Sequence, residues 1–396
     1  MPPSHALPKG WERRSIADLF DIRASGDIDW ARWSREQDAN HLHPVYANGR
    51  ADSGLHGYAS YAVEKSDAIT LTARGTLGEL GFAFFRSTAF TPIGRLLVLR
   101  SRGDADARFF ASYINGLVRF AQENTGVAQL TAPQIARYQI DLPPLAEQYA
   151  ISTALSDVDA LIAGLEKLIA KKRDLKQAAM QQLLTGQTRL PGFSGDWASR
   201  SLGSLGATYG GLVGKGKNDF GHGSARYVPF VNVMANIRID CGALEPVNVA
   251  STENQNRVLC GDLLFNGSSE TPEEVALCAL MTQTVDDLYL NSFCFGFRFK
   301  QGAEASGLFL TYLMRSQMGR ELMKSLAQGS TRYNLSKSAL LQARLVLPNL
   351  EEQTAIATVL SDMDADLSAL EARLAKTRDL KQGMMQELLT GRTRLV

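Results

Sequence analysis

One segment of 49 residues occurs twice in this chain of 396 residues, and this duplication constrains the fold more than any other sequence feature. Residues 142–190 align with residues 347–395 at a constant offset of 205, without insertions, and 31 of the 49 positions are identical. Two copies are too few for a solenoid, in which at least three stacked repeats share a core. The sequence therefore predicts two pseudo-equivalent halves.

Each copy is predicted to form one helix of about 40 residues. No proline interrupts residues 145–185, and Gly186 and Gly391 stand where such helices are expected to end. Apolar residues recur in alternating steps of four and three, which is the spacing of a heptad seam. The predicted helix-pairing residues are Ile151, Leu155, Val158, Ile162, Leu165 and Ile169 in the first copy and Ile356, Leu360, Met363, Leu367, Leu370 and Leu374 in the second.

Two helices that each carry an apolar seam most simply pair with each other. An antiparallel pair would relate the two halves by a pseudo-twofold axis, with one globular domain at each end. The alternative is that each helix packs along its own domain. The near-identity of the copies favours pairing, because packing against two different domains would let the helix sequences diverge.

Polar positions late in each helix also match between the copies, although the pattern predicts that they are exposed. Charged surface residues need a reason to be the same, and a partner protein that docks identically on both copies supplies one. The predicted subunit-docking residues are Arg173, Asp174, Lys176 and Gln177 in the first copy and Arg378, Asp379, Lys381 and Gln382 in the second.

The remaining sequence is predicted to form two globular domains that mix helices and strands. Strands are expected at 68–72, 95–99, 227–233 and 293–299, and helices at 107–120 and 307–327. A weaker repeat, 11–19 against 197–205, marks the domain starts, but beyond it the two domains hardly resemble each other. The predicted boundaries are 1–141 for the first domain, 142–189 for the first helical region, 190–346 for the second domain and 347–396 for the second helical region.

Composition argues against several classes of protein. The net charge of +1 carries no whole-chain signature of nucleic-acid binding, although residues 1–141 contain 14 arginines and only 2 lysines. No apolar stretch approaches the roughly 18 residues of a membrane span, so a cytoplasmic location is expected. The four cysteines are irregularly spaced, which favours buried free thiols over a zinc site. We find no catalytic or metal-binding constellation.

Several motifs together resemble the DNA-specificity subunit of type I restriction-modification systems. The pattern Leu-Pro-x-Leu-x-Glu-Gln precedes both predicted helices, and both end in Leu-Leu-Thr-Gly-x-Thr-Arg-Leu. Further family-like stretches lie at 69–78, 261–274 and 330–336. The resemblance covers essentially the whole chain, in which the duplicated helices alternate with two dissimilar domains.

This resemblance implies an α+β fold with two target-recognition domains and two long helices that pair as an antiparallel coiled coil. It also implies a non-catalytic subunit that binds double-stranded DNA, in which each domain reads one half of a split, asymmetric site. The helices would set the spacer between the half-sites and dock two methyltransferase subunits, and restriction subunits would join the assembly. S-adenosylmethionine, ATP and magnesium would belong to those partner subunits.

Candidate base readers are polar residues in loops with nearby glycines, because loops on a rigid domain can enter a DNA groove. Ordinary turn chemistry is the alternative for each residue, and a protein-only coiled-coil adaptor is the alternative for the whole chain. The candidates are Tyr46, Asn48, Arg50, Arg74 and Thr76 in the first domain and Lys215, Lys217, Asn232, Asn266, Ser268, Ser269, Arg332, Tyr333 and Asn334 in the second.

Overall fold

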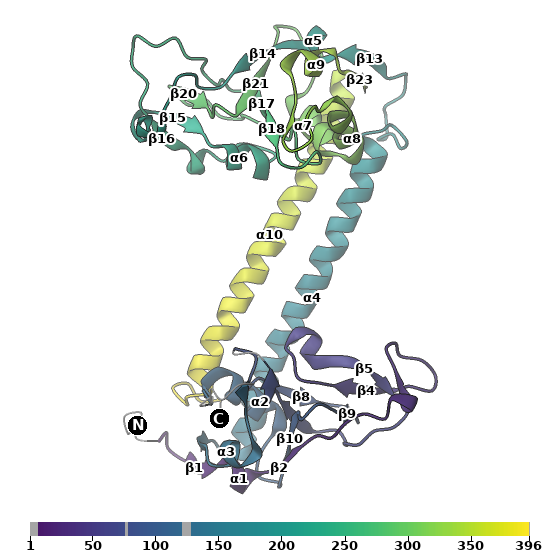
Figure 1. The fold of residues 1–396 in the computed structure, drawn as a ribbon, viewed down its shortest axis with the longest axis vertical. Helices are drawn as coiled ribbons and strands as arrows, with labels where there is room; N and C mark the ends of the chain where they lie inside the picture. Colours follow the sequence, from purple (N-terminus) through teal and green to yellow (C-terminus); the bar gives the residue numbers. More distant parts are fainter. Residues whose placement is uncertain (1–6, 76–77, 121–127, 396) are drawn as a thin grey trace. The chain divides into compact units, whose positions relative to one another are not determined.

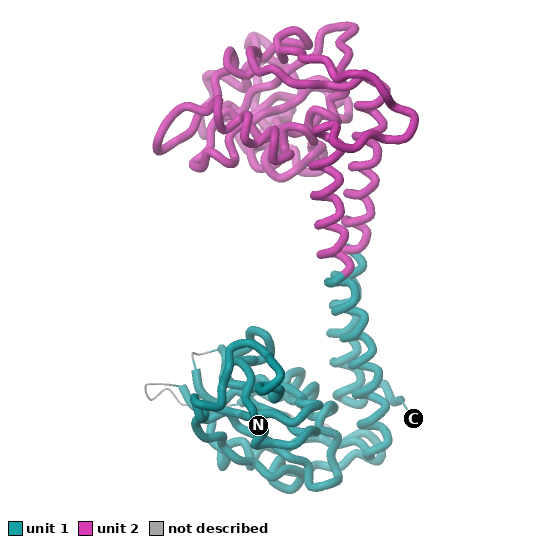
Figure 2. Tube along the Cα trace, turned by 90° about the vertical axis from the view of Figure 1, so that its right-hand side faces the viewer, with its two compact units in different colours: residues 1–167, 372–396 teal, residues 168–371 magenta. Residues whose placement is uncertain are grey.

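The chain forms two compact units in the computed structural model, which describes residues 7–75, 78–120 and 128–395. Unit 1 comprises residues 1–167 and 372–396, and unit 2 comprises residues 168–371 (Figure 2). Each unit therefore contains one mixed α/β domain and part of each long helix.

The two predicted long helices are present as α4 (Leu145–Leu183) and α10 (Leu350–Leu388), each of 39 residues (Figure 1). In unit 1, Lys381 and Arg378 of α10 pair with Asp159 and Glu166 of α4. The residue numbers fall on one helix as they rise on the other, so the segments are antiparallel. In unit 2 the ion pairs between the helix halves follow the same rule. The α+β fold with paired long helices is confirmed.

The predicted seam serves two kinds of packing. Ile151 and Leu155 are buried in the core of the unit 1 domain, and Ile356 and Leu360 are buried in the core of the unit 2 domain. Farther from the domains, the seam positions are buried or half-buried along the helix pair. Packing on the domain and helix pairing therefore both occur, at different ends of one apolar stripe. The seam positions farther along are Val158, Ile162, Leu165, Ile169, Met363, Leu367, Leu370 and Leu374.

The unit 1 domain is built on a four-stranded antiparallel sheet covered by α2 (Ala107–Leu117). Its strand order is β2-β10-β6-β8, and a smaller sheet of order β3-β5-β4-β9 adjoins it. The strands are β2 (Phe20–Ala24), β3 (Trp33–Ser34), β4 (His43–Tyr46), β5 (Leu55–Ala59), β6 (Ala68–Leu71), β8 (Ala83–Arg86), β9 (Thr91–Pro92) and β10 (Leu97–Ser101).

The unit 2 domain repeats this topology despite its different sequence. Its main sheet has the order β14-β21-β17-β19, which is the same first-fourth-second-third arrangement, and the smaller sheet has the order β16-β15-β20. In both smaller sheets one strand pairs antiparallel on one side and parallel on the other. The strands are β14 (Gly206–Gly210), β15 (Phe220–Val228), β16 (Glu245–Val247), β17 (Leu263–Asn266), β19 (Cys278–Leu280), β20 (Leu288–Leu290) and β21 (Cys294–Phe299).

The remaining elements also correspond. Each domain starts with a strand that pairs with the strand before its long helix, which explains the repeated segments at 11–19 and 197–205. Unit 1 contains β1 (Glu12–Ser15), α1 (Ile16–Leu19), η1 (Trp30–Arg32), η2 (Ala51–Gly54), β7 (Arg74–Gly75), β11 (Ala128–Gln129), α3 (Ala132–Ala136) and β12 (Gln139–Leu142). Unit 2 contains β13 (Ala198–Ser201), α5 (Leu202–Leu205), η3 (Lys217–Asp219), α6 (Phe230–Ala235), η4 (Cys241–Ala243), β18 (Ser268–Ser269), α7 (Gly307–Arg315), α8 (Gln317–Leu326), β22 (Tyr333–Asn334), α9 (Lys337–Gln342) and β23 (Arg344–Leu347).

Two predicted elements are wrong in detail. The strand predicted at 227–233 ends at Val228, because Pro229 has no amide hydrogen for a ladder and instead begins helix α6. The helix predicted at 307–327 is two helices, since Ser316 adopts extended dihedral angles and its hydroxyl accepts from the amide of Gly319 to cap α8.

The repeated Glu-Gln and Thr-Arg motifs form one clamp in each unit. Arg394 donates to both carboxylate oxygens of Glu147 at 2.5 and 2.7 Å in unit 1, and Arg189 does the same to Glu352 at 2.5 and 2.6 Å in unit 2. Both glutamate side chains are fully buried. We call each Arg–Glu pair the clamp of its unit, and it ties the segment that follows one long helix to the first turn of the other.

The glutamine of the same motif fastens each long helix to its domain. Gln148 accepts from the backbone amide of Asp106 at 2.8 Å, and Gln353 accepts from that of Ser306 at 2.9 Å. Asp106 and Ser306 are the N-caps of α2 and α7, so the two contacts are equivalent. Among the described residues, no helix is both long and apolar enough to span a membrane.

Candidate nucleic-acid interface

A short two-stranded ribbon follows the second strand of each main sheet, and several candidate readers lie on it. In unit 1 the ribbon pairs Arg74 of β7 with Gln129 of β11. In unit 2 it pairs Ser268 and Ser269 of β18 with residues of β22. The Arg74 side chain is exposed, so its guanidinium is available to a ligand. Thr76, another predicted reader, lies outside the described residues.

Asn48 holds the unit 1 loops together. Its side-chain oxygen accepts from the amides of Ala73 and Arg74 at 2.8 and 3.2 Å, and its side-chain nitrogen donates to the carbonyl of Gly94 at 2.6 Å. These bonds tie three segments that are distant in sequence to one point. Asn48 therefore positions other candidate readers while its own amide is occupied by the protein.

Arg50 and Tyr46 differ in how free they are. The Arg50 guanidinium is exposed and lies 3.8 Å from the centre of the Phe82 ring. Tyr46 is half-buried, with the guanidinium of Arg86 at 3.4 Å from its ring centre. Burial lowers the pKa of Arg86 to about 10, so its cation persists at neutral pH. Arg50 is thus presented to solvent, whereas Tyr46 packs against a buried cation.

In unit 2 the candidate segments surround one hollow of about 370 Å³. It lies between the loop after β14, the β18–β22 ribbon and the turn before β21, so segments from four parts of the sequence meet there. The lining contains no carboxylate. Its residues are Gly210, Gly211, Leu212, Val213, Gly267, Ser268, Ser292, Phe293, Cys294, Phe295, Asn334, Leu335 and Lys337.

The predicted role of base reader does not fit Asn266 and Asn232, because both residues are buried. Asn266 is 0% exposed, and its side-chain nitrogen donates to the carbonyls of Ser268 and Glu274. Asn232 is 5% exposed and hydrogen bonds to the backbone of Asp240. These side chains shape loops from inside. The preference of asparagine for turns, which was the alternative interpretation, accounts for both.

Ser268 and Ser269 are also largely covered, with 7% of each residue exposed. The hydroxyl of Ser269 donates to Glu274 at 3.2 Å and accepts from the amide of Thr271. Ser268 lines the hollow, whereas Ser269 is committed to internal hydrogen bonds. Ser268 therefore remains a candidate reader, and Ser269 is corrected to a loop-forming residue.

The two lysines of the loop after β14 are not equivalent. Lys215 pairs with Glu253 at 2.5 Å, and only 5% of its side chain is exposed. The hydrogen bond from Lys215 lowers the pKa of Glu253 to about 2, so the pair stays ionised at neutral pH. Lys217 is exposed. A contact with DNA phosphates therefore fits Lys217 and does not fit Lys215, whose charge is already neutralised.

Arg332 and Asn334 are exposed next to the hollow, and Tyr333 between them is half-buried. The guanidinium of Arg332 lies 5.5 Å from the centre of the Phe293 ring. Asn334 donates to the carbonyl of Arg332 at 3.2 Å, which stiffens the turn. The sequence analysis missed Phe293, because it is the first residue of the strand predicted at 293–299 and an aromatic residue in a strand is typical of a core position, whereas β21 starts at Cys294.

Ion pairs within the molecule explain why the arginines and lysines among the predicted docking residues match between the two copies. Arg173 pairs with Glu371 at 2.6 Å in unit 2, and the equivalent Arg378 pairs with Glu166 at 2.6 Å in unit 1. The lysines of the same motif repeat this relation: Lys176 pairs with Asp364, and Lys381 pairs with Asp159 at 2.6 Å. These ion pairs explain the matching charges of the four residues without an external partner.

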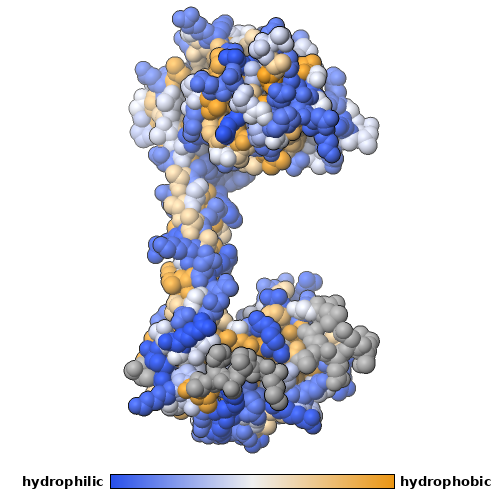
Figure 3. Space-filling model, turned by 90° about the vertical axis from the view of Figure 1, so that its left-hand side faces the viewer, coloured by the Kyte–Doolittle hydropathy of each residue, from blue (hydrophilic) through white to orange (hydrophobic). Residues whose placement is uncertain are grey.

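The other four docking candidates, Asp174, Gln177, Asp379 and Gln382, are exposed. Large apolar residues are exposed on the same helices, and Figure 3 shows hydrophobic patches there between hydrophilic residues. They are Leu145, Tyr149, Leu161 and Leu380 in unit 1 and Leu168, Leu175, Leu350 and Val359 in unit 2. Exposed apolar side chains along a helix are typical of a surface that another protein covers.

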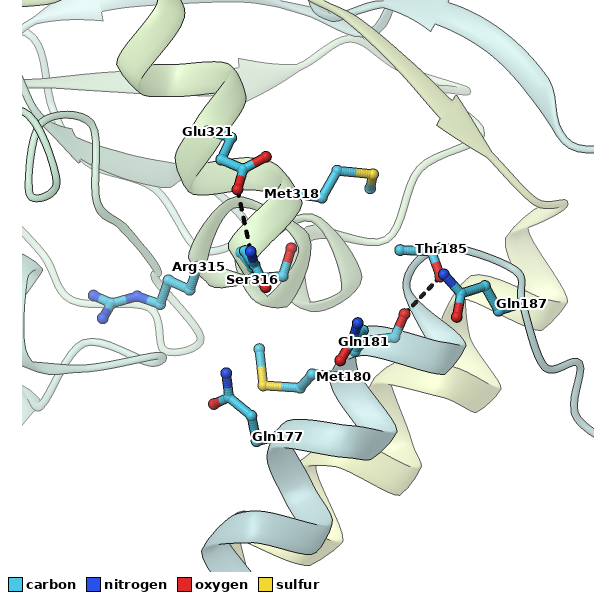
Figure 4. A pocket seen from close by; sticks show the side chains of 10 residues that line it. Gln177, Met180, Gln181, Thr185, Gln187, Arg315, Ser316, Met318 and Glu321 are labelled. Carbon is cyan, nitrogen blue, oxygen red and sulfur yellow. Dashed lines mark hydrogen bonds between the residues drawn. The ribbon is translucent and has the colours of Figure 1, made fainter.

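Gln177 borders a hollow of about 230 Å³ between α4 and the junction of α7 with α8 in unit 2 (Figure 4). The Arg315 side chain in its lining donates to four backbone carbonyls, including that of Cys278 at 2.7 Å. The Gln317 amide donates to Glu321 at 3.2 Å. The charged groups of this hollow therefore serve the fold.

The cysteines are all free thiols. Cys278 and Cys294 are buried, which raises the pKa of their thiols to about 11 and about 12 and makes them unreactive. Cys241 is half-buried and Cys260 is exposed, so the expectation of buried thiols holds for two of the four. Within the described ranges, no group of three or more His, Cys, Asp or Glu side chains could hold a metal ion.

Comparison with known proteins identifies the family of this arrangement. The family model of the type I restriction modification DNA specificity domain matches residues 8–172 and 250–377, which is more than half of the chain. The chain belongs to the type I DNA-specificity family. Each of the two matched segments includes part of one domain and most of one long helix, in agreement with the duplication.

Relatives within this family are distant in sequence. The chain is 24% identical over 179 residues to a protein of Mycoplasma pneumoniae named as a type I specificity subunit, covering 45% of this chain and 48% of that one. It is 23% identical over 283 residues to the specificity subunit of the type I restriction enzyme MjaVIII of Methanocaldococcus jannaschii, covering 69% and 66%. The chain thus spans about half the length of the first of these relatives.

Solved structures show the same fold. The type I S subunit of M. genitalium matches with a TM-score of 0.63 and 14% identity, covering 98% of this chain and 99% of that chain. The HsdS subunit of Thermoanaerobacter tengcongensis matches with a TM-score of 0.52 and 15% identity, covering 98% of each chain. At this identity the likeness establishes the fold alone.

Proposed function

We propose that this chain is the specificity subunit of a type I restriction-modification complex and has no active site of its own. The domain of each unit reads one half of a split, asymmetric site in double-stranded DNA. The paired helices set the spacer and dock two methyltransferase subunits, and restriction subunits join that assembly. S-adenosylmethionine, ATP and magnesium are bound by those partner subunits and not by this chain.

One observation carries this proposal: two domains of the same topology present different side chains at equivalent loops, while the helices and clamps are nearly identical. Readers of two different half-sites need different groups on the same frame, since bases are distinguished by side chains at their groove edges. Docking sites for two copies of one partner need identical surfaces. The division between variable and constant parts matches both needs.

The dimensions also suit a split site. A helix of 39 residues is about 58 Å long at 1.5 Å per residue. One turn of B-DNA rises about 34 Å, so a helix pair of this length is comparable with a site whose halves lie more than one turn apart. Two readers held at a defined separation multiply their specificities, because the second contact becomes intramolecular.

The near-neutral net charge of the chain fits a subunit whose partners provide part of the contacts with DNA phosphates. Phosphate contacts by Lys and Arg supply much of the affinity of a DNA-binding protein, and a chain with net charge +1 has few to spare. Arg50, Arg74, Lys217 and Arg332 are the exposed cations among the candidate readers. Partner subunits would provide the remaining phosphate contacts.

Co-expression with a type I methyltransferase subunit from the same genome tests the proposal. We expect a stable complex that methylates one discrete split site, detected by sequencing modified bases across the DNA of the expressing cells. A complex that forms but methylates no split site and binds no duplex DNA would support the protein-only adaptor. Failure of the two proteins to co-purify would contradict the proposed docking.

A further inference from the structure

One turn in each domain presents a large exposed side chain beside the candidate readers. In unit 1 this turn joins β9 to β10 and carries Arg95, and in unit 2 it joins β20 to β21 and carries Phe293. Both residues are exposed, Phe293 to 59%. We call these two the turn-tip residues. Neither belongs to the loops that sequence reasoning selected.

The two turns occupy equivalent places in the common topology. The amide of Ser25, after β2, donates to the carbonyl of Leu96 at 2.8 Å. The amide of Gly211, after β14, donates to the carbonyl of Cys294 at 3.2 Å. Each acceptor directly follows a turn-tip residue. The same position of the same fold therefore carries a cation in one domain and an aromatic ring in the other.

Both turns are held firmly by the ends of other segments. The amide of Phe293 donates to the side chain of Asn291 at 2.9 Å, and its carbonyl accepts from the amide of Gly267 at 2.9 Å. In unit 1 the carbonyl of Gly94 accepts from Asn48, the side chain that also binds the β7 ribbon. Each turn is thus attached to a segment that carries candidate readers. These hydrogen bonds fix the backbone of the turn, so its side chain stays exposed.

The exposed position of neither residue is explained by the stability of its domain. A phenylalanine that stays mostly in water forgoes the burial that usually favours it. Arg95 has φ +67°, a left-handed conformation that is unfavourable for a residue with a side chain. Strained backbone at an exposed loop tip is typical of a position selected for contact with a ligand.

The chemistry around Phe293 fits DNA, which is a polyanion with stacked bases. Arg332 places its guanidinium 5.5 Å from the Phe293 ring centre, and the adjoining hollow contains Lys337 and no carboxylate. An apolar wedge beside a cation is suited to contact bases while the cation meets the backbone phosphates. An exposed arginine is the side chain that most often recognises guanine in the major groove.

We propose that the turn-tip residues Phe293 and Arg95 are specificity-determining contacts with duplex DNA, one for each half-site. Phe293 contacts bases by stacking or by partial insertion at a base step, and Arg95 donates hydrogen bonds to a base edge. This inference rests on the proposed function, since it assigns particular side chains to its two reading surfaces.

The test uses the full-length chain in complex with its methyltransferase subunit and two DNA libraries, each with one half-site randomised. Phe293→Ala and Arg95→Gly are compared with Val231→Ala, which shortens a side chain that is 71% exposed in unit 2 but outside the hollow. Methylated molecules are sequenced to give base preferences. Thermal melting of each variant records folding.

We expect Phe293→Ala to reduce discrimination at one half-site at least about fivefold and to leave the other half-site unchanged. Arg95→Gly should do the converse without lowering the melting temperature, because glycine tolerates the left-handed conformation. Phe293→Leu should retain part of the preference, since it keeps an apolar wedge. Val231→Ala should match the wild-type preferences.

Other outcomes would overturn the inference. If both variants leave both preferences unchanged while the wild-type complex methylates its split site, the turn tips do not read DNA and the proposed function stands. If Phe293→Ala removes the methyltransferase subunit and leaves the preferences of the residual complex intact, the ring is a protein-docking contact. A wild-type complex that methylates no split site would instead refute the proposed function.

Discussion

The contacts of units 1 and 2 are most alike where both contacting residues lie in the duplicated segment. The interhelical pairs Arg378–Glu166 and Arg173–Glu371 are related by the offset of 205 at both residues, and so are the two clamps. The units differ most at loop tips, where a side chain touches solvent. Within the repeat, the residues of these internal contacts are therefore the same in both units, whereas the loop tips of the two domains carry different side chains.

The comparison predicts that breaking a clamp has the largest effect. Arg394→Ala leaves the fully buried carboxylate of Glu147 without its bidentate partner, which is strongly unfavourable. We expect the melting temperature to fall by about 10 °C in calorimetry. Arg189→Ala should cause a similar loss, because its clamp is equivalent. Arg392→Ala is the matched control, since its pair with Glu387 is exposed.

Adding Glu147→Gln to Arg394→Ala should restore part of the lost stability, because the buried charge is then removed. A small, equal effect of Arg394→Ala and Arg392→Ala would show that the clamp is not the structural tie between the helix ends.

The next largest effect is expected on DNA recognition from Arg74→Ala. Its guanidinium is exposed on the β7 ribbon, so its loss should weaken binding to the cognate site by about 1 to 3 kcal/mol, with nonspecific affinity nearly unchanged. Competition binding of the methyltransferase complex with cognate and scrambled duplexes measures both. An equal loss on both duplexes would make Arg74 a phosphate contact.

Asn266→Ala should give the opposite pattern. This side chain is buried and donates two hydrogen bonds, so we expect a loss of about 2 kcal/mol in the free energy of unfolding. Its base preferences in the randomised-library assay should be those of the wild type. A changed base preference in a variant that melts normally would restore Asn266 as a reader.

The smallest effect is expected from the exposed interhelical ion pairs. Arg378→Ala removes a pair whose side chains are both about half-exposed, and such pairs contribute about 0.2 to 1 kcal/mol. Chemical denaturation of Arg378→Ala and Arg173→Ala should therefore give nearly equal, small losses. Asp379→Ala and Asp174→Ala serve as matched controls, because these residues of the same motif are exposed.

Co-purification of the same four variants sharpens the docking proposal. If the aspartate variants keep their stability and lose the methyltransferase subunit, the exposed residues of the motif contact that partner. Loss of binding only in the arginine variants would place the docking contact on the ion pairs themselves.

Much of the architecture was predictable from the sequence because it depends on local periodicity. The heptad spacing, the absence of proline and the terminal Gly186 and Gly391 predicted the two long helices closely. Arg74, Arg50 and Arg332 were predicted as candidate readers from loop chemistry, and the structure leaves all three exposed. Local patterns could not reveal that Asn266 and Asn232 point inward, because an asparagine in a turn can face either the protein interior or the solvent.

The sequence by itself determined the duplication, the helix lengths and the seam, since these depend on residues close together in the chain. Tertiary structure alone decided that the two dissimilar domains share one strand order, because sheet pairing joins segments far apart whose side chains can vary. It also decided that the matching charges of Arg173 and Arg378 serve pairing between helices, and that Arg95 and Phe293 occupy equivalent tips. Such relations arise only when distant segments are brought into contact by the packed core.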